Sequence, residues 1–172
     1  MRKFAPLAIA LLMALGLPSC ASTPEKTPAK IRSKTPPPAD GPSRIELVTK
    51  PLAFQDQQEP FMTEKVFEFD LPRPPRRARL KLRYSGVPGN QNPDYLQGKF
   101  RHKVELNDRY LMDLNTFSEG EERVVEYTKW ISVGMFRRHN KIKFSAGHNE
   151  NREARPDHDE FELRQAVLEF DW

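Results

Sequence analysis

Apolar and polar residues alternate in short runs along most of the chain after residue 45. The clearest run covers residues 77–84, where four apolar side chains (Ala78, Leu80, Leu82, Tyr84) alternate with four cations (Arg77, Arg79, Lys81, Arg83). Successive side chains of a strand point to opposite faces, so this pattern predicts a strand with one buried face and one wet face. Similar runs predict strands at 66–71, 102–106, 110–114, 123–133, 141–146 and 161–172.

The last of these runs changes phase part of the way along. Its apolar residues are in step as far as Leu163 and again from Ala166, but the two sets are out of step with each other. One extra residue in a strand produces such a shift, so we expect a β-bulge near Arg164 and Gln165. No segment has sustained helical periodicity. The pattern predicts an all-β domain over residues 45–172, an antiparallel β-sandwich of seven or eight strands.

The first twenty residues follow a different pattern. Arg2 and Lys3 precede an apolar run at 4–17, which is too short to cross ~30 Å of hydrocarbon as a permanent helix. Residues 1–19 are therefore predicted to be a signal peptide. The run ends in Leu17-Pro18-Ser19-Cys20, which resembles the lipobox of bacterial lipoproteins, although Pro18 stands where that family usually has a small or β-branched residue.

The lipobox resemblance implies that Cys20 carries lipid and anchors the protein in the bacterial cell envelope. Ala21 follows the cysteine in place of Asp, which in that family favours the outer membrane. More than one acyl chain gives stable anchoring, at about 0.8 kcal/mol per buried CH₂. Cys20 is the single cysteine of the chain, so no intramolecular disulfide can form. The alternative is an ordinary signal peptide that is cut elsewhere and leaves a free thiol.

Residues 20–44 are predicted to form a disordered tether. Six prolines lie there among Ser, Thr and Lys, and such a segment cannot bury enough surface to offset its ordering entropy. The positive charge is concentrated in the same part of the chain, because residues 1–44 hold seven basic and two acidic residues, whereas residues 45–172 hold 21 and 22. The domain lacks the positive charge that nucleic-acid binding needs, so we exclude nucleic acid as a partner.

The order of the strand motifs resembles that of galactose-binding-domain-like jelly rolls. The matching segments span most of residues 65–172: 77–82, 103–107, Trp130, 140–144 and 159–163 ahead of a final apolar strand. The resemblance implies a jelly-roll β-sandwich whose loops at one end often meet ligands. It also implies that catalysis is often absent and that a structural calcium is common. No ligand-binding motif of that family matches this sequence residue by residue.

The best-known catalytic motifs are absent: the sequence has no Gly-x-Ser-x-Gly, His-Glu-x-x-His or phosphate-binding glycine loop. Glu119, Glu121 and Glu122 cluster, but adjacent acids in a glycine-containing turn are more often solvated than catalytic. We therefore expect no enzyme activity. For calcium, which takes roughly six to eight oxygen ligands, the candidate residues beside the polar stretch 148–151 are Asp157, Asp159 and Glu160. A plain hydrophilic loop is the alternative.

The stretch 85–99 is long for a connection within a sandwich. Its amide and carboxylate side chains suit sugar hydroxyls, and Tyr95 offers a ring for stacking. The candidate ligand-binding residues are Asn90, Asn92, Asp94, Tyr95 and Gln97. The alternative is a surface insertion, for which Gly, Pro and Asn are also the expected residues.

Two further features have both a structural and a functional interpretation. The cations of 77–83 can grip an anionic glycan or a lipid phosphate, but charge on the wet face of a strand also discourages edge pairing. Trp130 lies among Val125, Tyr127 and Ile131 and is predicted to be a core residue, with a ligand platform as the alternative.

Two functions stay open. One is a lipid-anchored, non-catalytic module that binds a glycan or another envelope polymer, and the other is a structural lipoprotein that docks onto a protein partner in an envelope assembly. A polar cleft with an exposed aromatic ring favours the first, and an exposed apolar patch of several hundred Å² favours the second.

Overall fold

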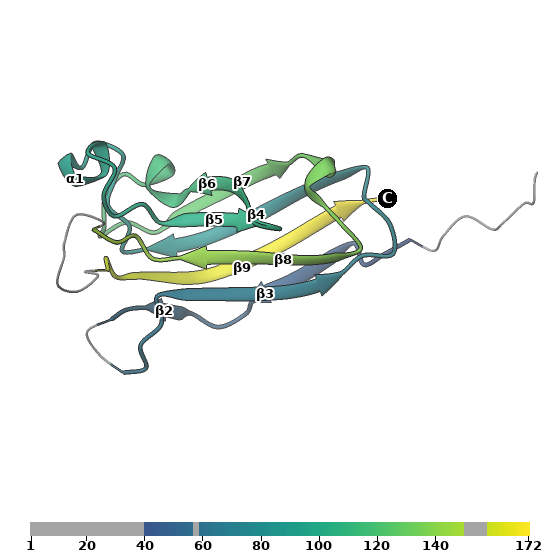
Figure 1. Ribbon diagram of the computed structural model, residues 1–172, viewed down its shortest axis with the longest axis horizontal. Coiled ribbons are helices and arrows are strands. Elements are labelled where there is room, and N and C mark those ends of the chain that lie inside the picture. The colour runs from purple at the N-terminus through teal and green to yellow at the C-terminus, as the bar shows by residue number, and fades with distance from the viewer. Residues whose placement is uncertain (1–39, 57–58, 150–157) are drawn as a thin grey trace, which may run out of the picture. The chain divides into compact units, whose positions relative to one another are not determined.

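The computed structural model describes residues 40–56, 59–149 and 158–172 (Figure 1). These residues contain nine strands: β1 (Arg44–Val48), β2 (Leu52–Phe54), β3 (Glu64–Asp70), β4 (Arg77–Ser85), β5 (Lys103–Leu106), β6 (Arg109–Asp113), β7 (Val125–Ile131), β8 (His139–Ser145) and β9 (Phe161–Asp171). They also contain a one-turn helix, α1 (Pro93–Leu96), and two short 3₁₀ helices, η1 (Leu114–Phe117) and η2 (Val133–Met135). The predicted signal peptide, Cys20 and most of the predicted tether lie outside the described residues.

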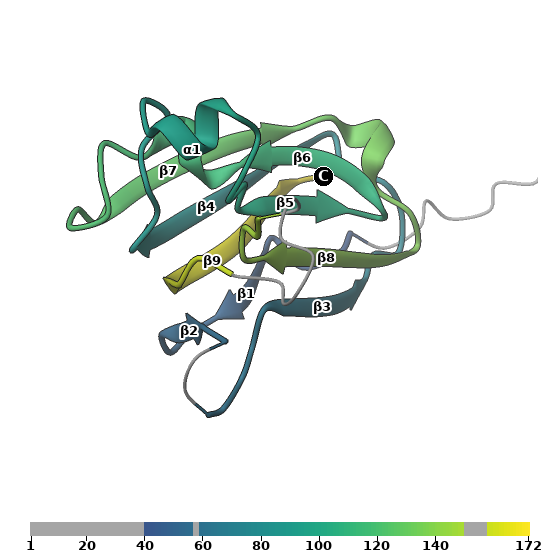
Figure 2. The same cartoon turned by 60° about the vertical axis from the view of Figure 1, so that its left-hand side comes forward.

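The strands form two antiparallel sheets that face each other, which confirms the predicted β-sandwich (Figures 1 and 2). One sheet, the β4 sheet, has the order β1-β9-β4-β7, and β2 also pairs with β9. The other, the β8 sheet, has the order β3-β8-β5-β6. The predicted strands lie within two or so residues of those observed. The finer resemblance to galactose-binding-domain-like jelly rolls stays a prediction.

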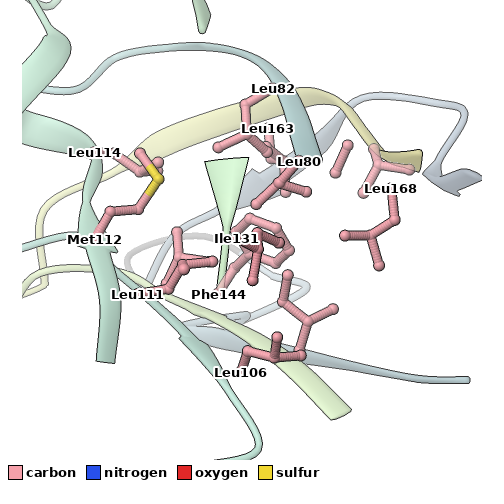
Figure 3. Close-up of a cluster of buried hydrophobic side chains, with 14 of the residues drawn as sticks. Leu80, Leu82, Leu106, Leu111, Met112, Leu114, Ile131, Phe144, Leu163 and Leu168 are labelled. Atoms are coloured by element: carbon pink, nitrogen blue, oxygen red, sulfur yellow. The ribbon is translucent and has the colours of Figure 1, made fainter. Parts of the chain in front are cut away.

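The core lies between the two sheets (Figure 3). β4 buries the apolar side chains that its alternation predicts, with Leu80 and Tyr84 fully inaccessible. Ile142 and Phe144 of β8 belong to the same buried cluster from the opposite sheet. Burying one such side chain stabilises the fold by about 1.5–3 kcal/mol, so the central strands of both sheets contribute strongly to stability.

The predicted bulge in the last strand is confirmed. Arg83 of β4 pairs with Gln165 of β9, whereas the next residue, Tyr84, pairs with Leu163, so Arg164 is the extra residue. The bulge allows Leu163 and Ala166 both to face the core, where neither is accessible. The change of phase in the sequence therefore follows from the need to bury both halves of one long strand.

The sequence pattern does not predict β1 and β2. The register of β1 against β9 is irregular between Glu46 and Val48, which interrupts the alternation, and β2 has only three residues. Both strands pair with β9, β1 near its C-terminal half and β2 near its N-terminal half. Neither run is long enough to show a period of its own, so the pairing with β9, and not the sequence pattern, reveals these two strands.

The two ends of the sandwich carry different segments. We call one of them the Trp172 end. There the Trp172 indole donates to the Pro42 carbonyl at 3.2 Å, and the Phe170 amide donates to the Ser43 carbonyl at 2.8 Å. We call the opposite end, which carries α1 and β2, the α1 end (Figure 1). Residues 40–44 are thus part of the domain, which extends beyond the predicted boundary at residue 45. No helix in the described residues is both long and apolar enough to cross a membrane.

Candidate functional site

Four side chains form a row across the outer face of the β4 sheet. The strand register places Trp130 of β7 opposite Arg79 of β4. It also places Arg79 opposite Glu169 of β9, and Glu169 opposite Arg44 of β1. Neighbouring strands lie ~4.8 Å apart, so three steps make this row about 14 Å long. We call these four residues the Trp130 row.

Glu169 holds the cations of this face in place. Its carboxylate lies 2.6 Å from Arg79 Nε, 2.8 Å from Lys81 Nζ and 3.7 Å from an Arg44 guanidinium nitrogen. The hydrogen bond from Lys81, reinforced by Arg79, holds the pKa of Glu169 below its usual range, although partial burial opposes this. The carboxylate is therefore ionised at neutral pH and orients the Arg79 guanidinium.

Trp130 is exposed, which shows that the prediction of a core residue was wrong. Its relative accessibility is 57%. The ring packs against Arg79, whose Cζ lies 5.6 Å from the ring centroid. Tyr127 and Ile131 point inward on the same strand, and Trp130 is out of step with both. The strand period applied to each residue of 123–133 would have placed Trp130 on the wet face.

The Trp130 row borders a groove of about 400 Å³. The polar residues that line it and the exposed Trp130 come from four strands and the segment before β1: Ser43, Arg44, Arg77, Arg79, Trp130, Glu169 and Asp171. The buried residues Ala78 and Phe170 complete the lining. An exposed indole offers a flat apolar surface to the C–H face of a sugar ring, and guanidinium and carboxylate groups offer paired donors and acceptors to adjacent hydroxyls. The groove can therefore hold and orient a polyhydroxylated ligand.

A larger hollow of about 830 Å³ opens at the α1 end. Carboxylates crowd its lining, which includes Glu121, Glu122, Asp159, Glu160 and Glu162. Of its three phenylalanine rings, Phe54 and Phe161 are buried and stack on each other with centroids 4.3 Å apart, and Phe100 is partly buried, so none is as exposed as Trp130. We therefore take the groove beside Trp130, rather than this larger hollow, as the candidate binding site.

A buried histidine lies close to the hollow. His102 is fully inaccessible, its Nε2 lies 3.3 Å from Asp159 Oδ2, and its Nδ1 accepts a hydrogen bond from the Gly147 amide at 3.1 Å. The amide contact assigns the ring proton to Nε2, so a neutral imidazole donates to Asp159. One of the predicted calcium ligands thus already has a partner within the protein.

The other two predicted calcium ligands are Asp157 and Glu160. Glu160 is exposed and lines the hollow at the α1 end, and Asp157 lies outside the described residues. Within the described ranges, no three or more His, Cys, Asp and Glu side chains are grouped so that they could hold a metal ion.

Several polar side chains of the predicted ligand loop bind other groups of the protein. Asn92 caps α1 by accepting from the Asp94 amide at 2.9 Å, and Asp94 pairs with Lys99 at 3.1 Å. Asn90 donates to the Thr116 carbonyl at 3.2 Å, and Gln97 is exposed. None of the five predicted residues lines the groove beside Trp130 or the hollow at the α1 end. Ligand binding by this loop stays a prediction.

Tyr95 links the same loop to a buried carboxylate. Its hydroxyl lies 3.4 Å from Asp113 Oδ2 and 3.2 Å from Thr116 Oγ1, and its ring faces Arg101 with the guanidinium carbon 5.7 Å from the centroid. Arg101 Nε lies 3.1 Å from Asp113 Oδ2, and this carboxylate raises the pKa of Arg101. These contacts favour an anchoring role for Tyr95.

No protein-family model matches the chain, and a search of curated proteins finds no match.

Proposed function

We propose that this protein is a lipoprotein of the bacterial cell envelope whose β-sandwich binds a glycan without cleaving it. The observation that carries the binding half is the exposed Trp130 ring, held beside Arg79 at the edge of a polar groove. The anchoring half rests on the signal-peptide pattern that ends in Leu17-Pro18-Ser19-Cys20.

The chemistry of the groove favours a sugar chain over an apolar ligand. Charged and hydroxyl side chains supply most of its lining, and one exposed aromatic ring, Trp130, supplies the flat apolar surface. The row of about 14 Å is long enough for a few sugar rings laid across the strands. Non-catalytic binding is supported by Glu169, because a glycosidase acid needs a raised pKa and the pKa of this carboxyl is lowered.

The Trp130→Ala variant tests the binding half. The purified chain is applied to a panel of oligosaccharides and to purified peptidoglycan, and bound protein is measured against concentration. We expect the variant to bind at least about tenfold more weakly, a loss of roughly 1.4 kcal/mol. Its melting temperature should change little, since the ring is largely exposed. Trp130→Phe should restore part of the binding because it restores a flat ring.

Phe61→Ala provides the matched control, because Phe61 is an equally exposed aromatic residue (60%) outside the groove. It should bind as the wild type does. Equal retention by Trp130→Ala and the wild type would refute the glycan site. Capture of an envelope protein in place of any glycan would instead favour the alternative function, a structural lipoprotein that docks onto a protein partner.

A further inference from the structure

The charges of the domain are divided between the two ends of the sandwich. Among the described residues, the Trp172 end carries six Arg residues (Arg73, Arg76, Arg77, Arg109, Arg137, Arg138) and four acids (Asp40, Asp70, Asp108, Asp171), whereas Arg44 and Lys141 lie level with Glu169 and Glu68. The α1 end carries five (Lys99, Arg101, Lys103, Arg123, Arg164) against eleven acids (Asp56, Glu59, Glu64, Asp94, Asp113, Glu119, Glu121, Glu122, Asp159, Glu160, Glu162). The nearly neutral domain therefore has a basic end and an acidic end.

Much of the basic charge at the Trp172 end faces solvent. Three of its four acids have partners, since Asp40 contacts Arg73, Asp70 contacts His139 and Asp108 contacts Lys141. Arg137 and Arg138 are exposed and form no side-chain ion pair within the part of the chain that the structure describes. These two guanidinium groups are thus available to an outside anion.

The segment that carries the two arginines is held by a buried amide network. Asn107 Nδ2 donates to the Met135 carbonyl at 2.8 Å and to Asn140 Oδ1 at 3.0 Å. Asn140 Oδ1 also accepts from the Arg137 amide at 2.8 Å. The backbone beneath Arg137 and Arg138 is therefore fixed, so little backbone ordering is needed when their side chains meet a surface.

Apolar and amphipathic side chains lie beside cations at the Trp172 end. The guanidinium carbon of Arg73 lies 5.8 Å from the Trp172 ring centroid, and Val133 of η2 is 38% exposed. The accessible part of the Trp172 ring and Val133 therefore present apolar surface beside cations, and arginine is attracted to anionic headgroups.

The described chain begins at this end, where the Pro42 carbonyl accepts from Trp172. Twenty residues, 20–39, separate Cys20 from the first described residue. Even as a continuous PPII helix, at ~3.1 Å per residue, they span about 60 Å, so an anchor on Cys20 keeps the domain close to the bilayer at a high effective concentration. The end at which the chain enters the domain is the basic one.

We propose that the Trp172 end of the domain docks onto the surface of a bilayer that contains anionic phospholipid. Arg137 and Arg138 supply the main electrostatic contact, and Val133 and Trp172 lie at the headgroup level. Docking directs the acidic α1 end away from the bilayer and holds the outer face of the β4 sheet at a set angle to it. This inference rests on the proposed anchor at Cys20 for its orientation, but the surface itself can be tested without lipid on the protein.

The test uses residues 20–172, the chain without its predicted signal peptide, with Cys20→Ala and vesicles of phosphatidylcholine with or without phosphatidylglycerol. We expect co-sedimentation with the anionic vesicles alone, weakened by added salt, because the Debye length falls to about 8 Å at physiological ionic strength. Each cation near an anionic surface is worth about 1 kcal/mol, roughly fivefold in partition. Arg137→Glu with Arg138→Glu should therefore lower partition at least about twentyfold, and the neutral Gln pair should lower it less.

Lys50→Glu with Arg123→Glu is the control, because it changes the net charge equally at exposed positions away from the Trp172 end. The proposal is overturned by unchanged partition of the Arg137 and Arg138 variants, or by an equal loss in the control. Thermal melts that match the wild type exclude misfolding of either variant. The anchor is tested separately, by fatty-acid labelling of the wild type against Cys20→Ala. Vesicle binding without such labelling refutes the anchor alone, and labelling without vesicle binding refutes the docking surface alone.

Discussion

At the scale of single residues, Tyr84 shows how the core accommodates a polar atom. The side chain is fully buried on β4, and its hydroxyl donates to the Leu114 carbonyl at 2.8 Å. Burial, with a smaller contribution from Tyr127, raises the pKa of Tyr84 above the ordinary tyrosine value of 10.0. The folded protein therefore keeps this phenol neutral under alkaline conditions that ionise it in the unfolded chain.

Tyr84→Phe should lower the free energy of unfolding by about 1–3 kcal/mol, because the buried Leu114 carbonyl loses its donor. Urea unfolding at neutral pH measures this change. The raised pKa adds a pH dependence: the stability from Tyr84 is complete below about pH 10 and is lost as the pH rises toward the folded-state pKa. The Phe variant should lose less stability than the wild type in that alkaline range. An equal or larger loss would show that Tyr84 does not control it.

At the scale of elements, the connection between β4 and β5 is held by its own polar side chains. Ligand binding by its amides and carboxylate stays a prediction, and in the structure Asn92 caps α1 and Asp94 pairs with Lys99. Gly86 enables the turn out of β4 with a φ of 82°, a value that favours glycine. Tyr95 then fastens the connection to Asp113 and Thr116. These contacts make the connection an organised unit on the edge of the sandwich.

Tyr95→Ala should lower the free energy of unfolding by about 1–2 kcal/mol, because it removes the hydroxyl contacts and the ring beside Arg101. Chemical denaturation measures the change, and Gln97→Ala, at an exposed position of the same connection, should have almost no effect. Glycan retention is measured in parallel. A variant that keeps full stability but loses retention would contradict the anchoring role and support the predicted ligand loop.

At the scale of the whole molecule, the start of the domain and its C-terminus depend on each other. Phe170 and Trp172 each donate to a carbonyl of the segment before β1, and Gly41 leaves no space for a side chain against the Trp172 ring. The C-terminal strand β9 also pairs with β1, β2 and β4, so the first and last strands of the domain belong to the same sheet.

We expect a fragment of residues 40–172 to fold cooperatively with the circular dichroism of a β protein, because the buried apolar cluster lies within it. A fragment of residues 45–172 should be less stable by about 1–3 kcal/mol, since it lacks both carbonyl acceptors. Thermal and urea unfolding compare the two. Equal stability would show that residues 40–44 contribute nothing, and a helical or non-cooperative fragment would contradict the assignment of the domain.

The sequence by itself determined seven of the nine described strands and their inner faces. Leu80 and Leu82 alternate with cations, and the change of phase around Arg164 locates the bulge, because side-chain direction along a strand is a local property with a period of two. The same rule indicates that Trp130 faces water. It does not indicate what lies beside the ring.

Only the tertiary structure decided which residues form the candidate site. The Trp130 row joins β1, β4, β7 and β9, and its members become neighbours through the registers of three strand pairs. The split of charge between the two ends likewise arises when turns from distant parts of the chain meet. For Asn92 and Asp94, the sequence shows which hydrogen bonds are possible but not which partners satisfy them. Contacts across a sheet depend on how the whole chain packs, whereas the alternation along each strand is set by its own residues.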